Sequence, residues 1–538
     1  MSCSRTPGLS RKSMAAVLLV SLCAFPLATL CGCGSSTAVT IGQGKVQGKA
    51  APNGTVAFKG IPYATPPVGE LRFKPPLPPK PWAGTLDASD FGKAAPQPQD
   101  ALESISPSQQ SEDCLNLNIW TPGADKSRRP VMVFIHGGGW TEGSGRVAVY
   151  DGAALAGRGD VVVVTLNYRL GALGFLYLGE AGGTEYAQSG NLGLLDQAAA
   201  LKWVATNISA FGGDPGKITV FGESAGSISV CALMGMPAAR GLFRRAIAQS
   251  GALNTVRNAD YAYSVTGRFM KHAGVTDVAG LKVLSATRII RAQKALMDEE
   301  FQSGTLFGPV IDGSVLPEPP LHAVAAGNAA GVDLLIGTNL DEVRAWTRRI
   351  PLLDRLSLKT ILPSFPMLQR VLGSSVDSIE AGYRSRRPGA TDGDITMAVG
   401  TDVLFRVPAI RVAEAQSAKQ PGTWMYLFTW PSPVSERLGS CHGIELPFVF
   451  GNLEEPGMEK FIGKNPPRKL AETMQDTWTA FARTGNPNNE SVPGWKAYDN
   501  RTRATMILNL KPSQKNDPYS EDRQLWDGIP FDSVNPSL

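Results

Sequence analysis

Short runs of almost uninterrupted apolar residues recur along the chain. They cover residues 131–135, 161–166, 218–221, 334–336 and 424–429. Strands that are apolar at every position are typical of parallel sheets, in which helices cover both faces. Helical patterns at residues 194–208 and 224–234 lie between these runs, so strand and helix alternate. The sequence therefore predicts an α/β fold: a mostly parallel central sheet, helices on both faces, and large loop and helical insertions.

Composition and charge exclude several other classes of protein. Of the 538 residues, 43% are hydrophobic and 18% are charged. Disordered chains, coiled coils and multi-span membrane proteins each have a strongly biased composition, and this chain does not. The formal charge of +5 falls to +2 without Arg5, Arg11 and Lys12 at the N-terminus. Nucleic-acid binding is therefore not expected.

The first residues resemble an export signal. Arg11 and Lys12 precede an apolar run at residues 14–30, which ends in small residues. Leu30, Gly32 and Cys33 resemble a bacterial lipoprotein processing box, in which the cysteine becomes the lipidated first residue. We predict that residues 1–33 are a signal peptide of the lipoprotein type. Cleavage near Ala38 with plain secretion and an uncleaved anchor are the alternatives.

All three alternatives predict that the rest of the chain is exported. A lipoprotein signal further predicts that the protein lies in the bacterial cell envelope and contacts the membrane only through the lipid on Cys33. Residues 34–538 are expected to form a single domain. After lipidation of Cys33 they retain Cys114, Cys231 and Cys441. This odd number leaves at least one free thiol.

A candidate nucleophile stands between a strand and a helix. Gly222-Glu223-Ser224-Ala225-Gly226 follows the apolar run that ends at Phe221, and an apolar helix begins there. Glycines two residues either side of a serine fit a tight turn that projects the hydroxyl into a cleft. The five-residue motif alone can arise by chance, and a helix-capping serine is the structural alternative. Asp214-Pro215-Gly216 predicts a turn before the strand.

A serine needs a base, usually a histidine, and the histidine needs an acid that orients it. His442 alone fits the chain order nucleophile, acid, histidine of this kind of site; the chain's other histidines are His136, His272 and His322. The acid is expected after a strand between Ser224 and His442. Glu342 and Asp341, which follow the strand at 332–337, are the first candidates, and Asp312 and Asp333 are further ones.

A glycine run follows another predicted strand. His136-Gly137-Gly138-Gly139-Trp140 comes directly after the apolar run 131–135. Consecutive glycines let backbone N–H groups converge on one point, where they can stabilise the oxyanion of an acyl-transfer transition state. The N–H of Ala225, next to the nucleophile, is the expected further donor.

Several further short sequence motifs occur in an order that is typical of one protein family. They cover residues 58–64, 112–116, 191–197, 211–215 and 442–451. With the motifs above, the chain from about Thr40 onward resembles the type-B carboxylesterase/lipase family, which includes the bacterial para-nitrobenzyl esterases and, more distantly, the cholinesterases. The resemblance implies an α/β-hydrolase fold. It implies that Ser224 is the nucleophile, Glu342 the acid and His442 the base. It also implies an oxyanion hole of Gly138, Gly139 and Ala225, with Glu223 as a charged neighbour of the nucleophile.

The resemblance further implies a structural ion pair between Arg72 and Glu112. The chain departs from the family pattern at three places. Val343 follows Glu342 where the family usually has glycine, and Cys114 lacks the partner of the family's disulfide. Residues 83–113 contain no tryptophan, with which cholinesterases hold a quaternary ammonium group, so a choline-ester specialist is not expected.

These features predict an exported serine carboxylesterase that needs no metal or other cofactor and whose partner is a small ester. Trp140, Leu306 and Phe307 are candidate pocket walls, together with Glu223. An amidase, a carbamate hydrolase or a lipase with the same triad is the alternative within the hydrolases. A non-catalytic binding homologue is the alternative outside them.

Overall fold

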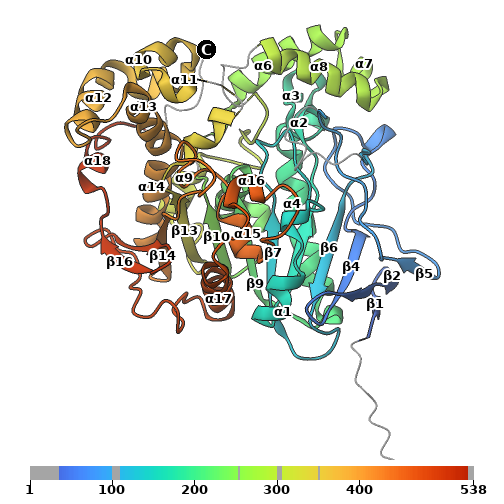
Figure 1. The fold of residues 1–538 in the computed structure, drawn as a ribbon. Helices are drawn as coiled ribbons and strands as arrows, with labels where there is room; N and C mark the ends of the chain where they lie inside the picture. The colour runs from blue at the N-terminus through green and yellow to red at the C-terminus, as the bar shows by residue number, and fades with distance from the viewer. Residues whose placement is uncertain are drawn as a thin grey trace, which may run out of the picture. The chain divides into compact units, whose positions relative to one another are not determined.

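A mixed β-sheet forms the middle of the computed structural model (Figure 1). The structure describes residues 36–99, 109–252, 255–299, 306–348, 350 and 352–530. Within these residues the sheet has 11 strands, of which the seven from β15 to β8 are parallel. In spatial order the strands are β16 (Ser513–Asn516), β15 (Ala504–Leu508), β14 (Thr423–Phe428), β13 (Asp333–Asn339), β10 (Arg245–Gln249), β9 (Gly213–Glu223), β7 (Arg129–Ile135), β8 (Val162–Leu166), β6 (Asn116–Thr121), β4 (Thr55–Pro62) and β3 (Lys49–Ala51).

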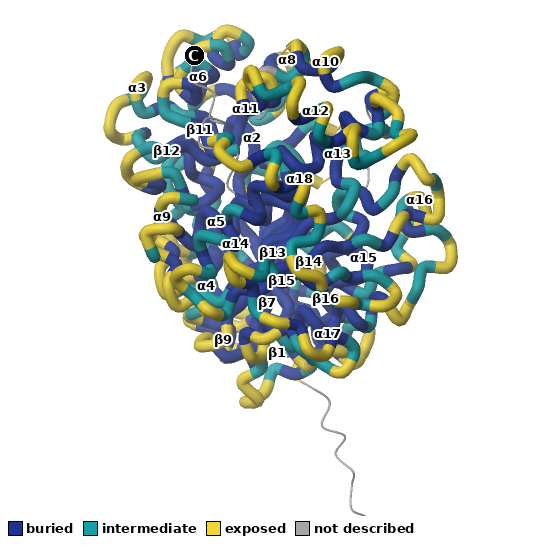
Figure 2. The backbone as a smooth tube through the Cα atoms, turned by 90° about the vertical axis from the view of Figure 1, so that its left-hand side faces the viewer, coloured by how far each residue is buried: buried dark blue, intermediate teal, exposed yellow. Residues whose placement is uncertain are grey.

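Successive side chains of the central strands enter opposite hydrophobic cores, because strand residues alternate between the two faces. On β7, Val131, Val133 and Ile135 enter one core, and Met132 and Phe134 enter the other. Helices α4 (Leu192–Asn207), α5 (Ala225–Gly235), α9 (Pro320–Ala326) and α14 (Val407–Ser417) belong to the first core. Helices α1 (Ala153–Gly159), α15 (Leu446–Phe450) and α17 (Arg468–Thr484) belong to the second. Figure 2 shows the buried sheet between exposed outer segments.

The predicted α/β-hydrolase architecture is confirmed, including its large insertions. One insertion follows the carboxyl end of β10 and holds α6 (Ala259–Ala273), α7 (Val278–Val283) and α8 (Ala286–Glu299). The other follows β13 and holds α10 (Leu358–Ile361), α11 (Pro366–Leu372), α12 (Val376–Ser385) and α13 (Asp392–Thr401). This second insertion has a hydrophobic core of its own, which also contains Trp526. Both insertions therefore begin at the edge of the sheet where α/β proteins bind ligands.

All five apolar runs form strands, and both helical patterns form helices, α4 and α5. The predicted turn at residues 214–216 is wrong, because β9 already begins at Gly213. The extra residues form an irregularity within the strand, where the pairing to β7 shifts between Arg129 and Val131. Asp214 stabilises this irregularity: its Oδ1 accepts the N–H of Gly216 at 2.9 Å. Upstream, β1 (Ala38–Ile41), β2 (Gly44–Gln47) and β5 (Thr85–Asp87) form a small separate sheet.

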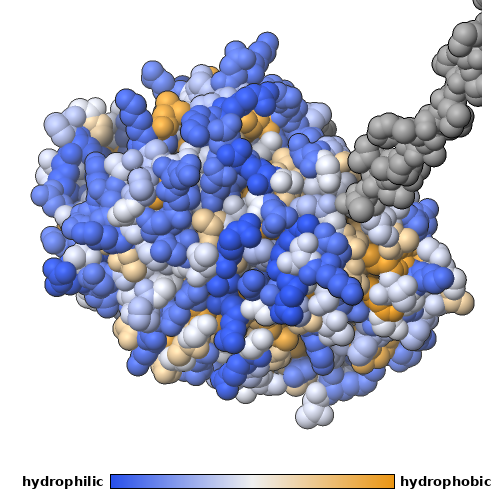
Figure 3. Space-filling view, turned by 90° about the horizontal axis from the view of Figure 1, so that it is seen from below, coloured by the Kyte–Doolittle hydropathy of each residue, from blue (hydrophilic) through white to orange (hydrophobic). Residues whose placement is uncertain are grey.

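The surface view in Figure 3 is mainly hydrophilic, with apolar residues in small separate patches. Across the described residues, no helix is both long and apolar enough to cross a bilayer. The predicted signal peptide and Cys33 lie outside the described residues.

Candidate active site

Ser224 lies at the sharp turn between β9 and α5. Its backbone angles, φ 58° and ψ −126°, match a turn position that glycine normally takes. Such a conformation costs a residue with a side chain about 1–3 kcal/mol, so the surrounding structure must hold it. The N–H of Ser224 donates to the carbonyl of Gln249 at 2.9 Å, and its own carbonyl accepts the N–H of Ile228 at 3.0 Å. Its hydroxyl does not cap α5, which excludes the helix-capping alternative.

The glycines around Ser224 allow close contact between α5 and the end of β7. A Cβ on Gly226 would lie 2.0 Å from the carbonyl oxygen of Ile135. This contact brings the start of α5 beside the glycine run that follows β7, and a Cβ on Gly137 would lie 3.0 Å from Cβ of Ser224. Ser224 and the predicted oxyanion loop are therefore neighbours.

The predicted oxyanion loop is held in a fixed conformation. Gly138 has φ +101°, and its carbonyl accepts the N–H groups of Thr141 and Glu142, both at 3.1 Å. Within the described residues, the N–H groups of Gly138, Gly139 and Ala225 donate no hydrogen bond to another loop or side chain. These three N–H groups therefore have no hydrogen-bond partner among the described residues.

Among the four candidate acids, Glu342 is the one that contacts His442. Its Oε2 lies 2.6 Å from Nδ1 of the imidazole, and its Oε1 accepts the N–H of Asn339 at 2.7 Å. The N–H of His442 also donates to the carbonyl oxygen of Glu342 at 3.2 Å. Glu342 is fully buried, so water does not compete for these bonds.

The other three candidate acids bind elsewhere. Asp341 accepts the N–H of Ser440 at 2.9 Å and lies 3.6 Å from Nε of Arg344. Asp312 accepts backbone N–H groups of its own turn, the first at Ser314. Asp333, at the start of β13, accepts a hydrogen bond from the amide of Gln420 at 2.7 Å. Glu342 is the candidate whose side chain faces the imidazole.

Glu223 approaches the other nitrogen of the same ring. Its Oε1 lies 3.1 Å from Nε2 of His442. Nε2 makes no hydrogen bond within the described residues, so none joins it to Ser224 Oγ in this structure. Hydrogen bonds between catalytic groups often tighten only when the substrate binds.

Burial and the nearby carboxylates shift the titration of this site. Burial lowers the pKa of His442, but the negative charges of Glu223 and Glu342 outweigh it and raise this pKa to about 9. Burial raises the pKa of Glu223 to about 8. The two groups titrate as a coupled pair, because the charge of each shifts the pKa of the other.

Sequence reasoning missed a buried carboxylate behind His442. Glu445 accepts hydrogen bonds from Gln249 at 3.0 Å and Asn339 at 2.6 Å, and burial raises its pKa. Since Asn339 also donates to Glu342, it connects the two carboxylates. The position of Glu445 three residues after His442, inside a recognised sequence block, was the available signal.

Two aromatic rings of the second insertion also escaped sequence reasoning. The ring centroids of Phe405 and Trp346 lie 4.9 and 5.1 Å from that of the His442 imidazole. The two rings are 5.9 Å from each other. They form an aromatic wall beside the imidazole.

The candidate pocket walls named from the sequence are buried. Trp140 donates its indole N–H to Ser229 at 3.0 Å and packs against Gly308. Phe307 contacts Phe269 edge to face at 6.2 Å and belongs to the core, as does Leu306. The Trp140 hydrogen bond joins the end of the glycine run to α5.

His136, Arg72 and Glu112, also named from the sequence, make contacts away from the imidazole of His442. His136 stacks on Tyr168 at 4.5 Å, and burial lowers its pKa to about 4. Arg72 and Glu112 form a two-contact ion pair, with Nε to Oε2 at 2.8 Å. Cys114, Cys231 and Cys441, of which at least one was expected to be a free thiol, are all free and buried.

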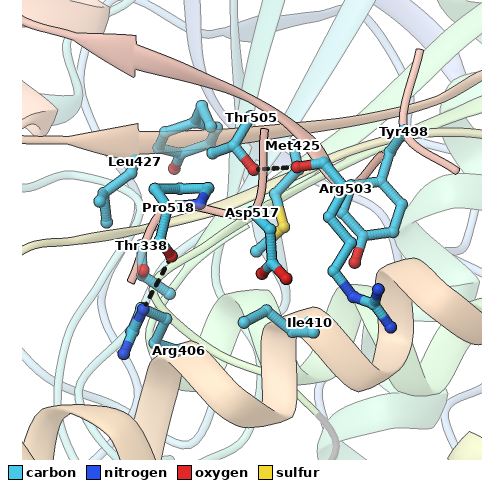
Figure 4. Close-up of a pocket in the computed structure, with 11 residues that line it drawn as sticks. Thr338, Arg406, Ile410, Met425, Leu427, Tyr498, Arg503, Thr505, Asp517 and Pro518 are labelled. Atoms are coloured by element: carbon cyan, nitrogen blue, oxygen red, sulfur yellow. Dashed lines mark hydrogen bonds between the residues drawn. The ribbon is translucent and has the colours of Figure 1, made fainter. Parts of the chain in front are cut away.

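A small cavity of about 20 Å³ lies elsewhere, between α14 and strands β13 to β15 (Figure 4). Thr338 and Tyr498 line it, and their buried hydroxyls have no partner among the described residues. This volume suits one water molecule. None of Ser224, Glu342 and His442 lines the cavity.

Serine hydrolases of the α/β-hydrolase class have a strained serine between a parallel strand and a helix. In their chain order the histidine follows the serine and the acid, as it does here. The sequence model described as the Carboxylesterase family matches residues 35–526. The chain belongs to this family and is a carboxylic ester hydrolase.

Known relatives cover almost the whole chain. A para-nitrobenzyl esterase of Bacillus subtilis (strain 168) is 44% identical over 90% of this chain and 97% of its own. A fumonisin B1 esterase of Sphingopyxis macrogoltabida is 37% identical over 82% of each chain. The crystal structure of a carboxylesterase of Geobacillus stearothermophilus superimposes with a TM-score of 0.83, at 40% identity, over 91% of this chain and 100% of that one.

Proposed function

We propose that Ser224, His442 and Glu342 form the catalytic triad of this serine carboxylesterase. His442 Nε2 removes the hydroxyl proton while Ser224 Oγ attacks the ester carbonyl, and the proton then passes to the leaving alcohol. Glu342 orients the ring and stabilises the imidazolium through Nδ1. Water hydrolyses the acyl-enzyme by the same route. The observation that carries the proposal is the 2.6 Å contact between Nδ1 and Oε2 beside the turn at Ser224.

The N–H groups of Gly138, Gly139 and Ala225 are proposed to bind the oxyanion of the tetrahedral intermediate. Support comes from the fixed loop at Gly138 and from the proximity of Gly137 to Ser224. The loss of one oxyanion donor typically costs about 10²–10³ in rate. Backbone donors need no reorganisation when the charge develops.

The proposed substrates are uncharged carboxylic esters, including esters of aromatic alcohols. The proton on Nε2 goes to the leaving oxygen, so the aromatic rings of Trp346 and Phe405 beside the imidazole are placed to contact the alcohol part. Similarity to a protein named a para-nitrobenzyl esterase points to the same substrate class.

The direct test is hydrolysis of p-nitrophenyl acetate, butyrate and octanoate by the purified full-length protein. Turnover is expected, and Ser224→Ala and His442→Ala should abolish it. Absence of both turnover and a pre-steady-state burst would contradict the triad and favour a binding homologue. The kcat/KM ratio of an ester to its matched amide tests the amidase alternative, and an emulsified triglyceride tests the lipase alternative.

We also propose that the chain is exported and anchored by lipid on Cys33. The supporting observation is the basic, apolar and small-residue pattern of residues 1–33. In cells grown with radiolabelled palmitate, the full chain should become labelled and Cys33→Ser should not. Equal labelling of both forms, or of neither, would contradict lipidation at this residue.

A further inference from the structure

A π-helical turn interrupts the helix beside the catalytic histidine. Residues Asp402–Arg406 form this turn between α13 and α14. Pro408, near the start of α14, cannot donate a helical hydrogen bond, and its ring crowds the preceding turn. π-helical turns are rare and occur frequently at functional sites.

A buried polar network holds the turn. Arg406 binds the carboxylate of Asp402 with two contacts, Nε to Oδ1 at 2.6 Å and a second guanidinium nitrogen to Oδ2 at 2.5 Å. Tyr383 on α12 donates its hydroxyl proton to the same carboxylate. Trp526 donates its indole N–H to the Tyr383 hydroxyl at 2.9 Å. All four side chains are buried, so each bond is protected from water.

The same turn carries Phe405. Asp402 and Arg406 point into the network, whereas the Phe405 ring lies against His442 and Trp346. A shift of the turn would therefore move Phe405 relative to the imidazole. The network contacts neither Ser224 nor Glu342 within the described residues, and Phe405 is the residue of the turn that lies against the imidazole.

We propose that Tyr383 is a positioning residue for the alcohol side of the active site: through Asp402 and Arg406 it fixes the π-helical turn, so that Phe405 and Trp346 receive a flat aromatic alcohol beside His442. This inference rests on the proposed function, because it assumes that His442 protonates the leaving alcohol. Selectivity for the alcohol then depends on the hydrogen bond between Tyr383 and Asp402, which does not itself contact the substrate.

The test compares benzyl acetate with ethyl acetate, which share the acyl group and differ in the alcohol. In full-length Tyr383→Phe, the ratio of kcat/KM for benzyl over ethyl acetate should fall about 3- to 10-fold, the effect of one lost hydrogen bond. The change should come from KM for benzyl acetate, with kcat for ethyl acetate unchanged. Tyr498→Phe is the matched control, since it removes a buried hydroxyl that has no partner among the described residues, and it should leave the ratio unchanged.

A double variant tests whether Tyr383 acts through Phe405. Phe405→Leu should lower the ratio, and Tyr383→Phe combined with Phe405→Leu should lower it no further. An unchanged ratio in either single variant, or full additivity in the double variant, would overturn the inference. Inactivity of the unsubstituted protein toward both esters would instead overturn the proposed function.

Discussion

Glu223 and Glu342 face opposite nitrogens of the His442 imidazole, with Oε1 of Glu223 at 3.1 Å from Nε2 and Oε2 of Glu342 at 2.6 Å from Nδ1. Two carboxylates stabilise the imidazolium that forms when Ser224 loses its proton. They also raise the pKa of the imidazole in the free enzyme, in which the neutral ring is the form that acts as base. The second carboxylate therefore influences the pH range of activity.

The Glu223→Gln variant should be active at lower pH. Burial lowers the pKa of His442, but the two carboxylates raise it to about 9, so kcat/KM should rise with pH through this value. Removal of one negative charge lowers this pKa, and the acid limb of the profile should move down by about 1 unit or more. Profiles of kcat/KM for p-nitrophenyl acetate from about pH 5 to 10 measure the shift. The exposed Glu436→Gln is the control, and an acid limb that stays in place in Glu223→Gln would contradict the argument.

Glu342→Gln and Asp341→Asn should differ sharply in kcat. In a serine triad, the amide replacement of the acid stabilises the wrong imidazole tautomer and costs about 10⁴-fold. Asp341 binds Ser440 and Arg344 instead and does not contact the imidazole, so its replacement should change kcat less than about 3-fold, the size of one partly exposed ion pair. Steady-state hydrolysis of p-nitrophenyl butyrate compares the two. Equal losses would show that both carboxylates orient the base.

Sequence reasoning singled out Ser224 and His442 because their signals are local. The apolar strand, the glycine turn and the helix are contiguous around Ser224, and His442 was the histidine that fitted the chain order. Glu342 and Asp341 are adjacent in a loop, so order alone could not separate them. In the structure the side chain of Glu342, and not that of Asp341, contacts the imidazole, and Glu342 is also the acid that the resemblance implies.

The aromatic wall could not be predicted in the same way. Trp346 and Phe405 are 59 positions apart and meet only because the second insertion folds around its own core. No local period identifies such a contact. Strand β10 was also missed, because the core positions Ala246, Ile247 and Ala248 make an apolar run too short to stand out.

Ser224→Gly should be more stable than Ser224→Ala. Both variants lack the hydroxyl, but glycine adopts φ 58° without strain, which relieves about 1–3 kcal/mol. Glycine also has more conformational freedom than alanine in the unfolded chain, and this freedom cancels about 0.4–1 kcal/mol of the stabilisation. A net gain of about 1 kcal/mol is expected in the free energy of unfolding from urea titrations.

The control for this comparison is Ser264, which lies inside α6. There Ser264→Gly should be less stable than Ser264→Ala by about 1 kcal/mol, because helical backbone favours alanine. If glycine were also the less stable replacement at Ser224, the turn would hold no strain.

The Arg72 ion pair should matter for stability and not for catalysis. Arg72 binds Glu112 and also donates to carbonyls at the C-terminal end of α7 and directly after it, including that of Leu284 at 2.6 Å. Arg72→Met leaves the carboxylate of Glu112 largely buried without its partner, which typically costs about 3–5 kcal/mol. The half-exposed pair of Arg158 and Asp476 provides the comparison, and Arg158→Met should cost about 0–1 kcal/mol.

The double variant Arg72→Met with Glu112→Gln separates two explanations of that loss. If the cost comes from the uncompensated charge of Glu112, neutralising it should restore part of the free energy of unfolding. If the cost comes from the carbonyls that Arg72 holds, Glu112→Gln should restore nothing. In both cases kcat for p-nitrophenyl acetate below the unfolding transition should match the unsubstituted protein, since Arg72 touches none of Ser224, Glu342 and His442. A fall in kcat without a fall in stability would instead place Arg72 in the catalytic machinery.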